Sequence, residues 1–98
     1  MVHVLVHHKV ADYSHWKEAF DSHLSTRKRA GEIGSHLFHN LDDPHEIYVL
    51  SDWQTVEEAR KFMSSSELAE TMKKAGVQGL PDVRFLEDVY AVHRTSAD

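Results

Sequence analysis

The sequence predicts one α+β domain in which a four-stranded antiparallel sheet carries helices on one face. Segments rich in β-branched residues alternate with segments whose apolar residues recur at the helical period, in the order strand, helix, strand, strand, helix, strand. This is the ferredoxin-like βαββαβ order. Because 98 residues support a single hydrophobic core, we expect one domain over residues 1–94 and a polar tail over 95–98.

A strand followed by a helix is predicted at the start of the chain. The run VHVLVHHKV, residues 2–10, is rich in the β-branched residues that favour strands. Asp12 then stands where a helix N-cap would, and Gly31 marks the end of a single helix. The residues that recur at the helical period are Trp16, Phe20, His23, Leu24 and Arg27.

A hairpin is predicted in the middle of the chain. The segments SHLFHNL and EIYVLSDW have the composition of strands, and DDPH between them holds Asp and Pro residues that favour a chain reversal. We expect the hairpin to pair Leu41 with Glu46, which would place His36 on the helix-covered face.

The second half of the chain is predicted to hold a helix in two pieces and a last strand. Thr55, followed three residues later by Glu58, forms a capping box before the first piece. The second piece is expected to run from about Ser66 to near Gly76. The segment VRFLEDVYAV, residues 83–92, is expected to be the last strand.

Both faces of the predicted sheet carry apolar residues. In the third strand, Ile47, Val49 and Trp53 share one face, while Tyr48 and Leu50 occupy the other. The helices can cover only one face, and a large apolar patch is rarely left open to water. We therefore expect two copies of the chain to pack sheet to sheet in a homodimer that forms an α/β barrel.

Composition argues against several functional classes. The formal net charge of −5 disfavours a nucleic-acid partner, and we interpret the basic cluster at residues 27–29 as a solvated helix end. The absence of cysteine excludes thiolate metal sites and thiol nucleophiles. No apolar run is long enough to span a bilayer, so we expect a cytoplasmic protein without a membrane partner.

Three stretches of the sequence carry a family resemblance, namely HKVADYSHWK, LFHNLDDPHEIYVLSDW and ELAETMKKAGV. With the element order, they resemble dimeric α/β-barrel proteins of the antibiotic biosynthesis monooxygenase type, closest to a small bacterial branch of that superfamily. The resemblance covers residues 2–90 and implies a barrel built from two chains. It leaves the activity open, because the superfamily includes cofactor-free quinone-forming monooxygenases, haem-degrading enzymes and isomerase-like proteins.

Two motifs of that superfamily can be compared with the chain. Its monooxygenases, as the resemblance implies, place an Asn and a Trp four residues apart on the third strand to hold a polycyclic phenol. Trp53 matches, whereas Val49 stands where the Asn would be. Haem-degrading relatives need a His on the second helical segment, and residues 55–75 contain none. We therefore expect neither haem nor another cofactor.

The nine histidines raise the question of a metal site. His3 and His7 share a face of the first strand but lie roughly 13 Å apart, which is too far to bind one ion. The trio that could meet on the helix-covered face is His8, His23 and His36. No HExxH pattern supports such a site, so we expect no metal and keep this trio as the alternative.

A pocket between the first helix and the sheet is the main functional hypothesis. His23 lies on the buried stripe of the helix and His8 ends the first strand on the same side, so both are candidate catalytic bases. The residues expected to bind a planar substrate are Tyr13, Trp16, Phe20, His36, Phe38, Ser51, Trp53 and Phe62. The alternative is a closed aromatic core in which each histidine has a hydrogen-bond partner.

We therefore expect a homodimer that binds a small planar aromatic or enolic metabolite. Its activity would be that of a cofactor-independent monooxygenase or a proton-transfer enzyme, in which deprotonation of the substrate allows reaction with oxygen. A non-catalytic dimeric binding or assembly module is the first alternative, and a histidine-based metal-binding protein is the second.

Overall fold

The computed structural model describes residues 1–92 and contains four strands and four helices in that range. Along the chain these are β1 (Val2–Val10), α1 (Tyr13–Ser22), α2 (Leu24–Ala30), β2 (Glu32–Asn40), β3 (Asp43–Trp53), α3 (Val56–Met63), α4 (Ser66–Lys74) and β4 (Val77–Glu87). The polar tail expected over 95–98, and residues 93 and 94 of the expected domain, lie outside the described residues.

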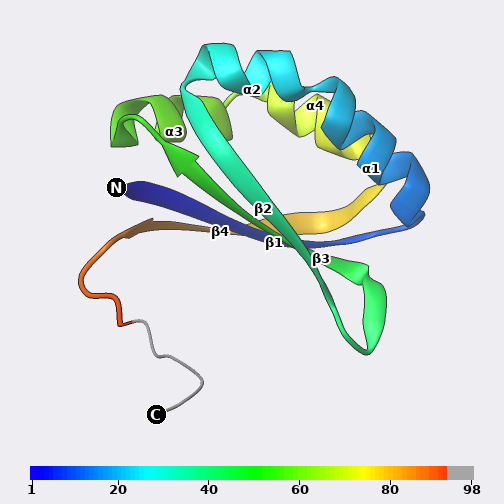
Figure 1. Ribbon diagram of the computed structural model, residues 1–98. Coiled ribbons are helices and arrows are strands. Elements are labelled where there is room, and N and C mark those ends of the chain that lie inside the picture. The colour runs from blue at the N-terminus through cyan, green and yellow to red at the C-terminus, as the bar shows by residue number, and fades with distance from the viewer. Residues whose placement is uncertain (93–98) are drawn as a thin grey trace.

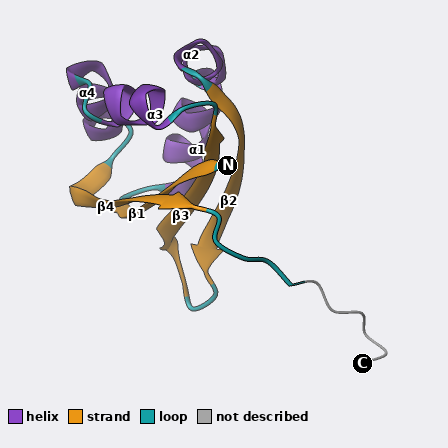
Figure 2. Cartoon of the chain, turned by 90° about the vertical axis from the view of Figure 1, so that its left-hand side faces the viewer, coloured by secondary structure: helices purple, strands orange, loops and turns teal. Residues whose placement is uncertain are grey.

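The strands form one antiparallel sheet in the order β2-β3-β1-β4. All of the described helices lie on one face of this sheet (Figures 1 and 2). The predicted ferredoxin-like α+β fold is confirmed. Within residues 1–92, none of the helices combines the length and the apolar character that crossing a membrane requires.

Side chains cap the helices at the residues that the sequence indicates. Asp12 Oδ1 accepts a hydrogen bond of 3.2 Å from the His15 N–H. Thr55 Oγ1 accepts one of 3.1 Å from the Glu58 N–H. Each cap satisfies a backbone donor that the first helical turn leaves without a partner, and both predicted caps are confirmed.

A break at His23 divides the expected first helix into α1 and α2. His23 has φ −88° and ψ 3°, outside the helical range. The Phe20 carbonyl accepts hydrogen bonds from the His23 N–H and from the Arg27 guanidinium. The prediction of one continuous helix is wrong here, because Arg27 supplies a partner to a carbonyl that the end of α1 would otherwise leave exposed.

Gly31 ends α2 and turns the chain into β2. It adopts φ 117°, in the left-handed region, and its N–H donates to the Lys28 carbonyl at 3.2 Å. A Cβ at this position would lie 2.7 Å from the carboxyl carbon of Glu58. The backbone conformation therefore requires glycine, whereas the Glu58 carboxylate is the end of a flexible side chain that can move aside. This turn places Glu32 at the start of β2.

The hairpin of β2 and β3 has a different register from the expected one. Leu41 lies in the turn between the strands, so the expected pairing of Leu41 with Glu46 is wrong. His36 faces Leu50 instead of Ser51. Facing residues of an antiparallel pair lie on the same side of the sheet, so this difference of one residue moves His36 to the face away from the helices.

The last strand begins and ends earlier than expected. β4 spans Val77–Glu87 rather than residues 83–92, because its partner β1 provides backbone groups only between Val10, which pairs with Val77, and Val2, which pairs with Glu87. Residues 88–92 leave the sheet (Figure 1).

The two faces of the sheet differ in composition. The helix-covered face holds the strand residues of the core, which are Val4, Val6, Val10, Ile47, Val49 and Trp53, all no more than 8% exposed. The open face mixes half-buried Leu5, Tyr48 and Leu50 with His3 and His7. The open face is therefore partly apolar and rich in histidine.

Gly31→Ala should destabilise the fold by about 1–2 kcal/mol, because an L side chain is strained in the left-handed region that Gly31 adopts. Urea denaturation of the variant measures the loss. Gly34→Ala is the matched control, since nothing lies within 4 Å of a Cβ built there. Equal losses in the two variants would contradict this role of Gly31.

Candidate functional site

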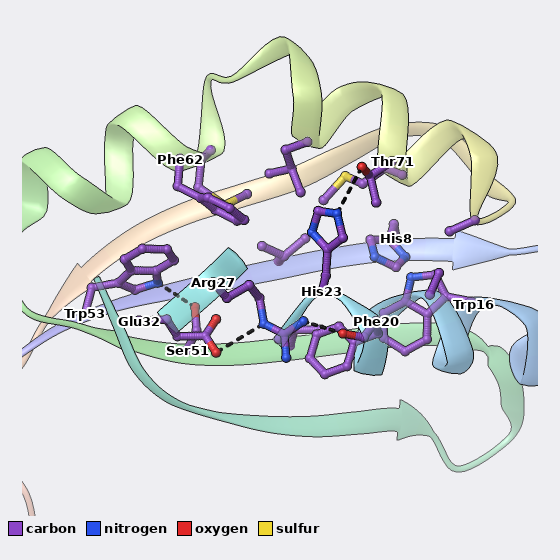
Figure 3. Close-up of a pocket in the computed structure, with 17 residues that line it drawn as sticks. His8, Trp16, Phe20, His23, Arg27, Glu32, Ser51, Trp53, Phe62 and Thr71 are labelled. Atoms are coloured by element: carbon purple, nitrogen blue, oxygen red, sulfur yellow. Dashed lines mark hydrogen bonds and ion pairs between the residues drawn. The ribbon is translucent and has the colours of Figure 1, made fainter. Parts of the chain in front are cut away.

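A cavity of about 80 Å³ lies between the helix layer and the sheet. Side chains from β1, β2, β3 and the described helices line it, and its walls are mainly apolar and aromatic (Figure 3). The polar side chains in the wall are His8, His23, Arg27, Glu32, Ser51 and Thr71. This composition, with few polar groups among apolar ones, is typical of small-molecule sites.

His8 is the polar group of β1 in this cavity. It is 5% exposed, and its Nδ1 is a buried atom without a hydrogen-bond partner. Its ring meets the edge of Trp16 at a centroid distance of 5.5 Å. Burial lowers the pKa of His8 from 6.5 to about 4, so the imidazole is neutral at pH 7 and a weak base.

His23 enters the cavity from the break between α1 and α2. Its Nε2 lies 3.3 Å from Thr71 Oγ1 of α4, and the two groups share a hydrogen bond (Figure 3). Because His23 lies at the break, its ring extends from the end of α1 toward α4. His23 therefore has a partner, and it still lines the cavity.

Trp53 and Ser51 form the part of the wall that β3 contributes. The Trp53 indole N–H donates to Ser51 Oγ at 2.8 Å, and Ser51 Oγ donates to the Val4 carbonyl at 3.4 Å. The Trp53 ring lies 5.3 Å from that of Phe62, centroid to centroid. These hydrogen bonds fix the indole and leave its ring as an apolar surface.

Arg27 and Glu32 form a buried ion pair in the cavity wall. They are 7% and 8% exposed, and Arg27 Nε donates to Glu32 Oε1 at 3.2 Å. The Arg27 guanidinium carbon also lies 3.8 Å from the centre of the Phe20 ring. The interpretation of residues 27–29 as a solvated helix end is therefore wrong for Arg27, because Glu32 and Phe20 hold it inside.

Seven of the ten residues expected at the site line the cavity, namely His8, Trp16, Phe20, His23, Ser51, Trp53 and Phe62. Tyr13 lies behind Trp16, with ring centroids 6.3 Å apart, and outside the lining. His36 and Phe38 stack on each other at 4.2 Å on the open face. Their expected place among the lining residues is corrected by the register of the hairpin.

The histidine trio considered for a metal does not come together. His8 and His23 line the cavity, whereas His36 lies on the opposite face of the sheet. Across residues 1–92, no group of three His, Asp or Glu side chains is arranged to hold an ion.

Sequence reasoning missed several lining residues. Arg27 stands seven positions after Phe20, on the buried stripe, and this spacing could have identified it as an inward-facing residue. Glu32 has no such signal. Met63, Leu68, Thr71 and Met72 come from α3 and α4, whose apolar spacing predicts a buried face but not a cavity.

The sequence profile of the antibiotic biosynthesis monooxygenase family matches residues 1–74. The chain belongs to this family. The match runs from β1 to the end of α4 and thus includes nearly all of the cavity wall. No curated protein shows a significant match to the sequence.

Solved structures of this family have the same fold. A protein of the antibiotic biosynthesis monooxygenase type from Bordetella bronchiseptica aligns with a TM-score of 0.77 at 19% identity, over 91% of this chain and 97% of the other. SnoaB, a cofactor-independent oxygenase from Streptomyces nogalater, aligns with a TM-score of 0.76 at 10% identity, over 95% and 97%. At these identities the likeness shows the fold alone.

His8→Leu should raise the free energy of unfolding at pH 7 by about 1 kcal/mol, because it removes a buried polar atom that has no partner and keeps a similar volume. Urea denaturation measures the change. His45→Leu, at an exposed position of the hairpin, is the control and should have little effect. Destabilisation by His8→Leu would contradict the unpaired state of Nδ1.

Acid should destabilise the wild type more than His8→Leu. Between pH 6.5 and about 4 the unfolded chain binds a proton at His8 that the folded chain does not, so stability falls as the pH falls. The loss due to His8 should reach roughly 3 kcal/mol at pH 4. Hydrogen bonds to Asp88 and Asp52 raise the pKa of His3, so His3 makes the fold more stable as the pH falls. This contribution is the same in the wild type and in His8→Leu, and it cancels when the two proteins are compared. A pH-independent difference would refute the prediction.

Proposed function

We propose that this chain binds a small planar molecule with a hydroxyl or enol group in the cavity and acts on it as a cofactor-independent monooxygenase. Membership in the antibiotic biosynthesis monooxygenase family supports a monooxygenase-like role. The fold shared with SnoaB, a cofactor-independent oxygenase, supports a reaction that needs no cofactor.

One observation carries the proposal, namely an aromatic cavity with an unpartnered polar atom in its wall. Trp16 and Phe20 stack with centroids 5.0 Å apart, and Trp53 and Phe62 lie 5.3 Å apart, so planar surfaces flank the space. His8 Nδ1 lacks a hydrogen bond, which costs about 1–3 kcal/mol for a buried group. A polar ligand atom would supply this bond.

The cavity volume favours a small ligand, and even a single ring requires side chains of the wall to move. At about 80 Å³ it is smaller than the roughly 150 Å³ of an engineered cavity that binds benzene. Met63 and Met72 line it, and their flexible side chains can move to widen it. A single ring requires less widening than the polycyclic phenols that the family resemblance implied, so we propose a single-ring ligand.

The proposed chemistry begins with loss of a proton from the ligand hydroxyl. The resulting anion is electron-rich and can reduce O₂ without a metal or a flavin. With a hydroquinone, one oxygen atom enters the ring to give a hydroxyquinone and the other leaves as water. The electrons lost by the ring equal those gained by O₂, so no further reductant is needed.

His8 and His23 have different roles in this proposal. The lowered pKa of His8 makes it a hydrogen-bonding group rather than the base that the sequence suggested. His23, held by Thr71 and facing the cavity, is positioned to orient a ligand oxygen.

The wild-type protein, free of added metal and flavin, should accelerate oxygen consumption by a hydroquinone. One heavy-isotope oxygen atom from labelled O₂ should appear in the product. His23→Ala should lower kcat/KM roughly threefold to tenfold, the value of one hydrogen bond. An oxygen electrode and mass spectrometry make these measurements, with His45→Ala as the control. Product without label would rule out a monooxygenase.

A non-catalytic binding or assembly module is the second candidate. The small cavity favours it, as do the internal hydrogen bonds of Trp53 and Ser51, which leave these groups complete without a ligand. Oxygen consumption equal to that of buffer, together with retained assembly, would select this function.

We also infer that two chains pack through the open face of the sheet. Phe38 and Leu86 lie on that face and are 44% and 42% exposed. With half-buried Leu5, Tyr48 and Leu50 they form an apolar area that the helices do not cover. Such an area favours burial against a second copy with the same surface.

Phe38→Glu should convert a dimer into a monomer, because a charge would be buried in the interface. Light scattering at micromolar concentration measures the mass. Leu41→Glu is the matched control, since Leu41 is exposed but lies in the hairpin turn. A wild-type monomer, or a Phe38→Glu dimer, would refute this interface.

A further inference from the structure

The ion pair of Arg27 and Glu32 places two opposite charges in the wall of an otherwise apolar cavity (Figure 3). Removing two such charges from water costs about as much as their attraction returns, so a buried pair is weak support for stability. Neither residue is a surface group, at 7% and 8% exposed. Their position in the wall therefore indicates that they contact a ligand bound in the cavity.

Both side chains keep an unused polar atom. Glu32 Oε1 accepts from Arg27 Nε, and Arg27 Nη1 donates to the Phe20 carbonyl. Among the described residues, Glu32 Oε2 and Arg27 Nη2 have no hydrogen-bond partner. The pair thus offers a ligand hydroxyl one acceptor and one donor.

Aromatic rings surround this pair. Arg27 lies over the Phe20 ring, and Glu32 faces Trp53 across β2 and β3. Phe62 lies next to Trp53 in the same wall. A planar ring between these side chains would direct a hydroxyl group at its edge toward the ion pair.

We propose that Glu32 accepts the hydroxyl proton of the bound ring and that Arg27 binds the oxygen anion that remains. The O–H bond of the ligand breaks, an O–H bond forms at Glu32 Oε2, and the electron pair stays on the ligand oxygen. Arg27 Nη2 then donates a hydrogen bond to that oxygen. The inference rests on the proposed binding of a hydroxylated ring and names the group that starts its reaction.

The transfer leaves the net charge in the cavity unchanged. Before it, Arg27 is paired with the Glu32 carboxylate and the ligand is neutral. Afterwards, Arg27 is paired with the ligand anion and Glu32 is a neutral acid. Because no uncompensated charge is buried at either stage, the site selects ligands that enter uncharged and disfavours carboxylates, which would bring a second negative charge to Glu32.

The ionisation of the two candidate bases agrees with this assignment. Burial raises the pKa of Glu32 above 4.5, although the Arg27 guanidinium beside it acts in the opposite direction. Burial lowers the pKa of His8 to about 4. A carboxylate with a raised pKa is a better proton acceptor near neutral pH than an ordinary one.

The test uses para-nitrophenol, whose anion absorbs visible light. At a pH below the pKa of the free phenol, binding to the wild type should produce the anion band. A pH indicator in weak buffer should detect no proton release, because the proton moves to Glu32. The infrared difference spectrum should show the C=O stretch of a newly protonated carboxylic acid.

Variants separate this role from a structural one. Glu32→Gln should lose the infrared band and release about one proton for each nitrophenolate bound, and Arg27→Met should bind the probe without the anion band. Exposed Glu18→Gln and Arg29→Met are the matched controls and should behave as the wild type. Glu32→Asp, which retains a carboxylate, should recover the infrared band.

Two results would overturn the inference. If the wild type bound neutral nitrophenol, or released the proton to solvent, the assignment of Glu32 would fail while the proposed binding of hydroxylated rings remained. If no nitrophenol bound at all, both the inference and the single-ring ligand of the proposed function would fail. The wild-type measurements decide these outcomes even if Glu32→Gln does not fold.

Discussion

The contacts of Arg27 connect the elements that frame the cavity. Its guanidinium donates to Glu32 at the start of β2 and to the Phe20 carbonyl near the end of α1, and it lies over the Phe20 ring. Because Arg27 supplies a partner to that carbonyl, the chain can bend at His23 without leaving it unsatisfied. The bend in turn brings His23 to Thr71. The shape of the cavity and its charge therefore depend on the same side chain.

The sequence predicts those parts of the fold that depend on local chemistry. Asp12 and Thr55 cap helices because each side chain reaches a backbone donor three residues away, and Gly31 ends α2 because it tolerates a positive φ. The predictions are wrong where the local structure depends on a residue or strand in another part of the fold. The limits of β4 follow the length of β1, and the break at His23 depends on the guanidinium of Arg27, which periodicity does not reveal.

The site is predictable to a similar extent and for the same reason. Trp16 and Phe20 follow from helical spacing, and Ser51 and Trp53 from alternation along a strand. His36 and Phe38 were misplaced because a register difference of one residue reverses the face of every side chain in β2. Glu32 could not be found, since its link to Arg27 appears only once Gly31 has turned the chain.

The residues of β3 in the cavity wall contribute apolar surface and few polar groups. Val49 occupies the position where the resemblance implies an Asn, and it is a buried apolar residue of the wall. The Trp53 indole N–H already donates to Ser51, whose hydroxyl donates to the Val4 carbonyl. The Trp53 and Ser51 side chains therefore offer a ligand no unused hydrogen-bond donor. Unused polar atoms remain on His8 and on the Arg27–Glu32 pair. His8 and Glu32 stand opposite β3 residues six positions apart, so their backbone positions lie roughly 20 Å apart along the strand. One hydroxyl group therefore cannot meet both, so the side chain that it meets determines whether the ligand is only bound or also deprotonated.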